Sequence, residues 1–288
     1  MEQSIENKFK FIHLPKLLKN TFSAWLDKDP FRLGAVVAYY SILSLPALLI
    51  IIMDIIGAIW GRELVQGELF SEIAAAVGSD TAASIQAMVT KKGDANTSVF
   101  ATVLGVGVLI YGATGVFYQL QNALDDIWGT EKKYSNDFIA VLFGRLKSFG
   151  FILIFGFLLL VSFVLTSLLT SFANRISTLL SSEIVGVAYF IDISLSLVFI
   201  YFLFASMFKY LPSKHLSWPA VRVGAALTTI LFIMGKYILA FYFSQSEPGS
   251  TYGAAGSIII VMLWVSYSSL ILFFGAQFTK VYSDKYLR

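Results

Sequence analysis

Six stretches of about 20 or more mostly apolar residues dominate this 288-residue chain. Each is long enough to cross a bilayer as an α-helix. None shows the two-residue alternation of a membrane barrel strand, and the bilayer core admits only helices and closed barrels. The sequence therefore predicts an all-α polytopic membrane protein, a single domain over residues 1–288. The predicted spans are residues 33–59, 98–118, 149–170, 184–208, 220–243 and 254–278.

The low content of charged residues excludes the other fold classes. Only 14% of the chain is charged, whereas an ordinary soluble domain carries about 25%. Intrinsic disorder is excluded because disordered chains are rich in charge and poor in apolar residues. Cysteine is absent from the sequence, which excludes disulfides and thiolate metal sites.

The basic residues are distributed unevenly between the predicted spans. Sixteen of the 21 precede the first span or lie in the second loop, the fourth loop or the C-terminal tail, while four lie in the alternate segments. Cytoplasmic segments of membrane proteins are enriched in lysine and arginine, so this asymmetry predicts a six-helix bundle with both termini in the cytoplasm. It also explains the net charge of +3 without a nucleic-acid partner.

Two segments outside the spans have helical patterns. Residues 1–32 form a predicted cytoplasmic N-terminal segment, with an amphipathic helix over residues 15–26 that either lies on the inner membrane surface or packs under the bundle. Residues 61–97 form a predicted external helical loop, which either covers the mouth of the bundle or only connects two spans. The apolar face of the N-terminal helix contains Leu18, Phe22 and Trp25.

Three charged residues lie inside predicted spans and away from the span ends: Asp54, Asp192 and Lys236. Charged side chains are costly in lipid and usually face a partner or water. At 1.5 Å per residue, the three lie roughly 8, 12 and 10 Å from the outer ends of their spans. One hypothesis is that Lys236 pairs with one or both carboxylates around a polar cavity that opens outward. The alternative is a structural ion pair or a lysine that reaches toward the interface.

Further residues are candidates for structural or gating roles. Pro46 interrupts the first span, which predicts a kink. Polar residues near the inner ends of the second and sixth spans form either an inner polar layer or an ordinary solvated boundary. These residues are Gln119, Gln121, Asn122, Asp125, Asp126 and Gln277.

Motifs for enzyme chemistry are absent from the sequence. It contains no P-loop, no H-E-x-x-H and no G-x-S-x-G. His13 and His215 are far apart in sequence and cannot make a histidine metal site unaided. Asp125 and Asp126 are adjacent and do not share a helix face. We therefore expect no catalysis, no cofactor and no metal.

Several short fragments, taken in order, resemble the YihY/BrkB family of bacterial inner-membrane proteins. The resemblance covers about residues 20–282, nearly the whole chain. The fragments are Ala38-Tyr39-Tyr40-Ser41, Leu43-Ser44-Leu45-Pro46, Gln121-Asn122-Ala123-Leu124, Ile127-Trp128, Tyr210-Leu211-Pro212, Gly224-Ala225, Gly235-Lys236, Tyr252-Gly253-Ala254, Leu263-Trp264-Val265 and Gly275-Ala276-Gln277.

The resemblance implies six helices with cytoplasmic ends and a location in the bacterial inner membrane. It adds Tyr252 and Gly253 to the structural or gating candidates. The family usually ends its last span with Gly-Ala-Glu, so Gln277 preserves a hydrogen-bonding role but not a carboxylate role. A former label of the family as a ribonuclease gains no support from these residues, while links to envelope integrity and lipid movement attach to some relatives.

Two functions follow as hypotheses. The first is a transporter or flippase-like protein for a lipid or amphipathic substrate, with membrane lipids as its partners. The second is a non-catalytic scaffold that maintains the envelope, with envelope proteins as its partners. An intramembrane enzyme is a remote third, because no residue set supplies a nucleophile, a base and an orienting group.

Overall fold

The computed structural model describes residues 11–61, 99–130, 183–214, 216–246 and 256–287, with a few single positions between 63 and 86. Every element in these ranges is helical. The elements are the 3-10 turn η1 (Phe11–His13) and the α-helices α1 (Leu14–Leu26), α2 (Pro30–Trp60), α5 (Val99–Trp128), α7 (Glu183–Tyr210), α8 (Trp218–Ser246) and α10 (Gly256–Tyr286).

Five of the predicted spans coincide with the long helices α2, α5, α7, α8 and α10. The predicted span at 149–170 and most of the predicted loop at 61–97 lie outside the described residues, although the described positions between 63 and 86 are helical. By length and composition, the stretches Trp218–Phe243 and Ile258–Tyr286 are each able to cross a membrane. The all-helical class is therefore confirmed for the described part of the chain.

Helix α5 is longer than the predicted span, which ended at residue 118. It continues to Trp128 because its apolar face continues, with Leu120, Leu124 and Ile127 buried at helical spacing. The helix then ends at Gly129, whose φ of 64° is the left-handed conformation typical of a glycine after a helix.

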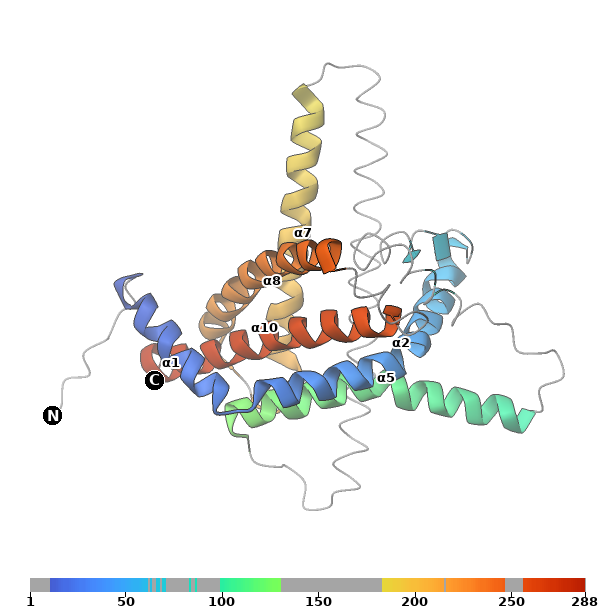
Figure 1. Ribbon diagram of the computed structural model, residues 1–288, viewed down its shortest axis with the longest axis horizontal. Coiled ribbons are helices and arrows are strands. Elements are labelled where there is room, and N and C mark those ends of the chain that lie inside the picture. Colours follow the sequence, from blue (N-terminus) through green and yellow to red (C-terminus); the bar gives the residue numbers. More distant parts are fainter. Residues whose placement is uncertain are drawn as a thin grey trace.

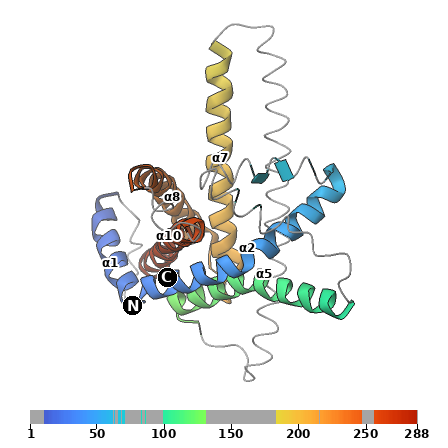
Figure 2. The ribbon, with the colours of Figure 1, turned by 45° about the vertical axis from the view of Figure 1, so that its right-hand side comes forward.

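Helix α10 is the centre of the arrangement. It packs against α1, α2, α5 and α8, while α2 also packs along α5 and α7 packs against α8. The helices meet at the end of the bundle where α1 and the C-terminus lie, and α7 rises steeply away from α10 in both views (Figures 1 and 2). Helix α2 continues through Pro46 without interruption and changes direction along its length in Figure 1, while the kink predicted at Pro46 itself stays a prediction.

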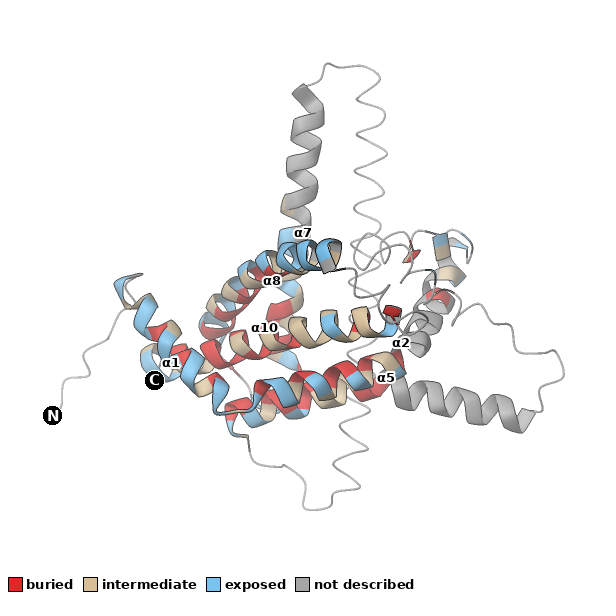
Figure 3. Cartoon of the chain, in the orientation of Figure 1, coloured by how far each residue is buried: buried red, intermediate tan, exposed pale blue. Residues whose placement is uncertain are grey.

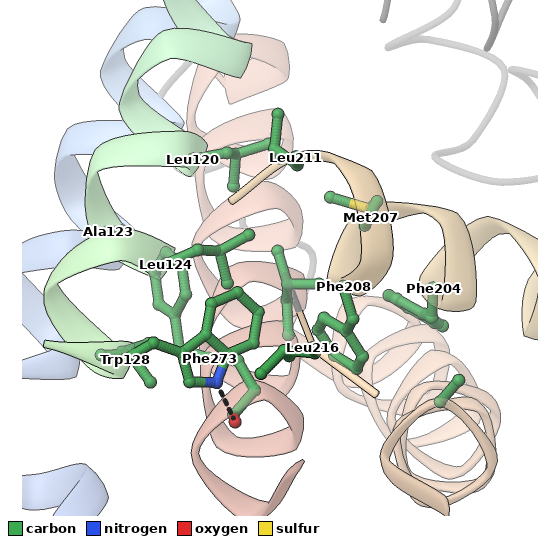
Figure 4. Packing of buried hydrophobic residues seen from close by; sticks show 14 of the residues in the cluster. Leu120, Ala123, Leu124, Trp128, Phe204, Met207, Phe208, Leu211, Leu216 and Phe273 are labelled. Atoms are coloured by element: carbon green, nitrogen blue, oxygen red, sulfur yellow. Dashed lines mark hydrogen bonds between the residues drawn. The ribbon is translucent and has the colours of Figure 1, made fainter. Parts of the chain in front are cut away.

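The largest buried cluster lies where α5, α7, α8 and α10 come together. Figure 3 shows buried residues concentrated on the facing sides of these helices, and Figure 4 shows Leu124, Phe208 and Phe273 interlocked there. All three side chains have no exposed surface. The ring of Trp128 meets that of Phe208 edge-on, with their centroids 6.2 Å apart. This end of the bundle is consequently a close-packed unit.

Helices α8 and α10 approach closely through a reciprocal pair of glycine and threonine contacts. A Cβ atom added at Gly224 would lie 1.8 Å from Oγ1 of Thr279, and one added at Gly275 would lie 1.8 Å from Oγ1 of Thr228. Each threonine hydroxyl donates to the carbonyl of the glycine four residues earlier on its own helix, at 2.7 and 2.8 Å. Small residues of this kind allow helix backbones to approach within membranes.

The structure confirms the predicted N-terminal helix as α1. The face of α1 that is buried differs from the predicted apolar face. Its buried residues are Leu17, Thr21 and Trp25, whereas Phe22 is 52% exposed. Of the predicted row of Leu18, Phe22 and Trp25, only Trp25 is buried, because the contact with α10 is centred one position earlier around the helix.

Candidate functional site

Lys236 is the one predicted intramembrane charge whose side chain the structure describes. It is exposed on α8. Asp54 lies in α2 and Asp192 in α7, but both side chains lie outside the described residues, so the predicted pairing stays a prediction. Tyr252 and Gly253 also lie outside the described residues.

Lys236 borders a narrow gap between α8 and α10, too small to hold a water molecule, roughly 27 Å along α8 from its start at 1.5 Å per residue. Tyr267 and Ser268, which carry hydroxyl groups, are among the α10 residues that line this gap. We call the set of lining residues the Lys236 seam. It consists of Phe232, Lys236 and Leu239 of α8 with Trp264, Tyr267, Ser268 and Ile271 of α10.

Packed aromatic rings are among the side chains that line the Lys236 seam. The ring of Phe232 meets Trp264 of α10 at 5.9 Å and Phe204 of α7 at 5.5 Å, both edge-on. Gly235 allows Tyr267 to lie directly on α8, because an added Cβ would fall 2.5 Å from a ring carbon of Tyr267. The seam therefore combines Lys236, Tyr267 and Ser268 with packed aromatic rings.

The surface around Lys236 is apolar. Met234, Tyr237 and Ile238 on α8 are all more than half exposed. No ion pair to Lys236 occurs among the side chains that the structure describes. A cation that stands alone on an apolar helix face is costly in lipid unless it reaches water or meets an anion. This arrangement suits an amphipathic ligand that has an anionic head and apolar chains.

A second polar cluster joins the helices at the end of the bundle where α1 lies. Ser213 follows α7, and its backbone N–H and hydroxyl donate to the two carboxylate oxygens of Asp125, each at 2.7 Å. The amide of Gln121 donates to the same hydroxyl at 3.2 Å. Asp125 and Ser213 are 88 residues apart in sequence, so this contact ties α5 to the segment after α7.

Three further donors meet backbone carbonyls at the same end. The ammonium of Lys280 donates to the carbonyl of Ile127 at 2.8 Å, and Trp128 donates to that of Ala276 at 3.2 Å (Figure 4). Lys209 donates to the carbonyl of Leu216. We call this cluster the clasp. It consists of Gln121, Asp125, Ile127, Trp128, Lys209, Ser213, Leu216, Ala276 and Lys280.

The polar residues predicted near the inner ends of the second and sixth spans have different environments in the structure. Gln121 and Asp125 belong to the clasp, while Asn122 and Asp126 are exposed. Among the described residues, the side chain of Asp126 accepts a surface contact from Lys28 at 3.3 Å. Gln277 is 4% exposed, and its side-chain oxygen has no hydrogen-bond donor among the described residues. Gln121 and Asp125 therefore join helices through hydrogen bonds, while the assignment of these residues to an inner polar layer or a solvated boundary stays a prediction.

Sequence reasoning missed several residues of both clusters. Tyr267 and Ser268 belong to a polar run, Ser266–Ser269, inside the otherwise apolar sixth span, and that interruption was a usable signal. Ser213 and Lys280 gave no local signal, because their partners lie far away in sequence. Among the described residues, no group of three or more His, Asp or Glu side chains is placed to hold a metal ion.

Comparison with known proteins identifies the family to which the chain belongs. The profile of the family described as virulence factor BrkB matches residues 21–287. The UPF0761 membrane protein of Vibrio campbellii is 25% identical over 255 residues, covering 86% of this chain and 76% of the relative. Its counterpart in Vibrio parahaemolyticus is 26% identical over 254 residues, with the same coverage. No solved structure matches the chain.

Proposed function

The chain is an integral membrane protein of the BrkB family, and from that premise we propose that it moves a lipid or amphipathic substrate across the bacterial inner membrane. The observation that supports this proposal most is the Lys236 seam. It places the exposed Lys236 next to Tyr267 and Ser268 of α10, on a part of α8 whose other exposed side chains are apolar.

The chemistry of the seam matches a phospholipid head. A phosphate accepts charge-assisted hydrogen bonds from an ammonium group, and these are stronger than neutral ones. The hydroxyls of Tyr267 and Ser268 supply further donors on the neighbouring helix. Acyl chains would stay in the bilayer beside the exposed apolar residues of α8, such as Tyr237 and Ile238. Asp54 and Asp192 would complete a polar path that opens outward.

The clasp has a supporting role in this proposal. It would lie at the cytoplasmic ends of the helices, where the predicted topology places both termini. Its hydrogen bonds and the packed cluster around Phe208 hold α5, α7, α8 and α10 together at that end. The remainder of α8 would then carry the substrate contact on a fixed base, and the proposal includes no catalytic step or cofactor.

Translocation in liposomes tests this function. The purified protein is reconstituted into vesicles that carry a fluorescent phospholipid, and a membrane-impermeant reductant removes the outer-leaflet signal. Vesicles with protein should lose signal from the inner-leaflet pool, whereas protein-free vesicles should retain it. Equal retention in both would contradict a translocation activity.

A scaffolding function is the second candidate, because the close packing of the clasp end favours a rigid component. In that case the same liposomes would behave like protein-free vesicles, although the protein is folded and inserted. Loss of envelope integrity in cells would then follow from removal of the protein and not from neutralisation of Lys236.

A further inference from the structure

Helix α1 has two apolar faces, and α10 covers only one of them. Leu17 on the covered face packs against Phe278 and Tyr282 of α10. Trp25 meets Phe274 of α10 edge-on at 5.9 Å. These contacts fix the rotation of α1 about its own axis and therefore fix which residues point away from the bundle.

The second apolar face remains exposed. Phe22 and Leu26 on α1 are 52% and 44% exposed, and Phe31 at the start of α2 is 61% exposed. The rings form one group, since Trp25 lies 5.7 Å from Phe22 and 5.9 Å from Phe31. We call Phe22, Leu26 and Phe31 the apolar edge.

Basic and polar residues border the apolar edge on its far side. At 100° per residue, the order around α1 runs from Leu17 through Trp25, Phe22 and Leu26 to Lys19. Lys16, Asn20 and Ser23 follow, and all are exposed. Around its circumference, α1 thus presents a protein-facing side, then an exposed apolar side, then a cationic polar side.

A short turn joins α1 to α2 and fixes the position of the apolar edge relative to the start of α2. Asp29 has a φ of 48°, and its carboxylate accepts a hydrogen bond from Arg32 at 2.9 Å. Helix α2 begins at Pro30, so Phe31 marks the level at which its apolar sequence starts. The apolar edge is therefore continuous with the start of a helix of an integral membrane protein.

We propose that α1 is an in-plane anchor whose apolar edge is covered by an anionic lipid leaflet. Helices with an apolar face beside lysines lie in the interface, with the apolar side buried about 5–10 Å into the headgroup region. Lys16 and Lys19 supply the charge that attracts anionic headgroups. This inference does not depend on lipid translocation.

The absence of cysteine from the chain allows a direct measurement of depth. Single substitutions Phe22→Cys and Leu26→Cys place a fluorophore on the apolar edge, and Asn20→Cys on the polar side of the same helix serves as the control. The full-length protein is reconstituted into vesicles of phosphatidylglycerol and phosphatidylcholine that contain brominated acyl chains. Quenching should be several-fold stronger at positions 22 and 26 than at position 20. The contrast should shrink in pure phosphatidylcholine and in a Lys16→Gln, Lys19→Gln background.

Three results would overturn the proposal. Equally weak quenching by brominated lipid at positions 20 and 22 would show that the apolar edge lies in water. Protection from aqueous iodide without quenching by brominated lipid would indicate another protein as the cover. Protection that rises with protein density in the vesicles would indicate a second copy of this chain.

Discussion

At the scale of single residues, Asp125 is the most constrained side chain of the clasp. Both of its carboxylate oxygens accept hydrogen bonds from Ser213. Hydrogen bonds to a charged group contribute roughly 1.5–3 kcal/mol each, and partial exposure reduces that value. We expect Asp125→Ala to lower the free energy of unfolding by about 2 kcal/mol, measured as a lower melting temperature in detergent.

The neighbouring residue supplies the matched control. Within the described part of the chain, the side chain of Asp126 makes an exposed ion pair with Lys28, and such pairs contribute about 0–1 kcal/mol. Asp126→Ala should therefore melt close to the wild-type protein. If the two alanine variants melted at the same temperature, the contacts of Ser213 would not stabilise the protein.

The sequence contained only part of the information about these residues. The cost of charge in lipid identified Lys236 from its neighbours alone, and the structure describes it as exposed on α8. The roles of Asp125 and Asp126 could not be separated, because the difference depends on Ser213, which is 88 residues away. The pairing of Lys236 with Asp54 or Asp192 stays a prediction.

At the scale of helices, the reciprocal contact between α8 and α10 is the closest that any described glycine makes. Gly224→Ala would place a methyl group on the hydroxyl of Thr279, and Gly275→Ala would do the same to Thr228. Overpacking of this kind typically costs about 1–3 kcal/mol. Each variant should melt at a lower temperature than the wild-type protein.

Gly67→Ala is the control for this prediction, because no other heavy atom lies within 4 Å of the added methyl group. Replacing Thr279 with glycine in the Gly224→Ala variant should recover part of the loss, since it removes the clashing side chain. If Gly224→Ala and Gly67→Ala had the same effect, the two helices would not be in close contact at Gly224.

Helix identity was predictable because apolar length alone determines a span. The residues at which helices end, and the faces that they bury, were less predictable. The apolar arc of α1 is wide enough to include both Leu17 and Phe22, and only the position of α10 determines which of them is buried. The extension of α5 to Trp128 follows from apolar spacing that continues beyond the predicted interface.

At the scale of the whole molecule, the bundle has a close-packed end and a lysine on an apolar face that forms no ion pair among the described side chains. Family membership, suggested by the short fragments, is confirmed by the profile match over residues 21–287. Fragments that are far apart in sequence meet at the clasp, including Gln121, Trp128 and Ala276.

The most direct test of the proposed function compares Lys236 variants in the liposome assay. Lys236→Met removes the charge and keeps an extended apolar chain, Lys236→Arg keeps the charge, and Lys285→Met, at an exposed lysine near the end of α10, is the control. A charge-assisted hydrogen bond contributes about 1.5–3 kcal/mol, so Lys236→Met should slow phospholipid translocation about tenfold or more. Lys236→Arg and Lys285→Met should stay near the wild-type rate. Translocation by Lys236→Met at the wild-type rate would contradict the role of Lys236 in contacting the lipid head.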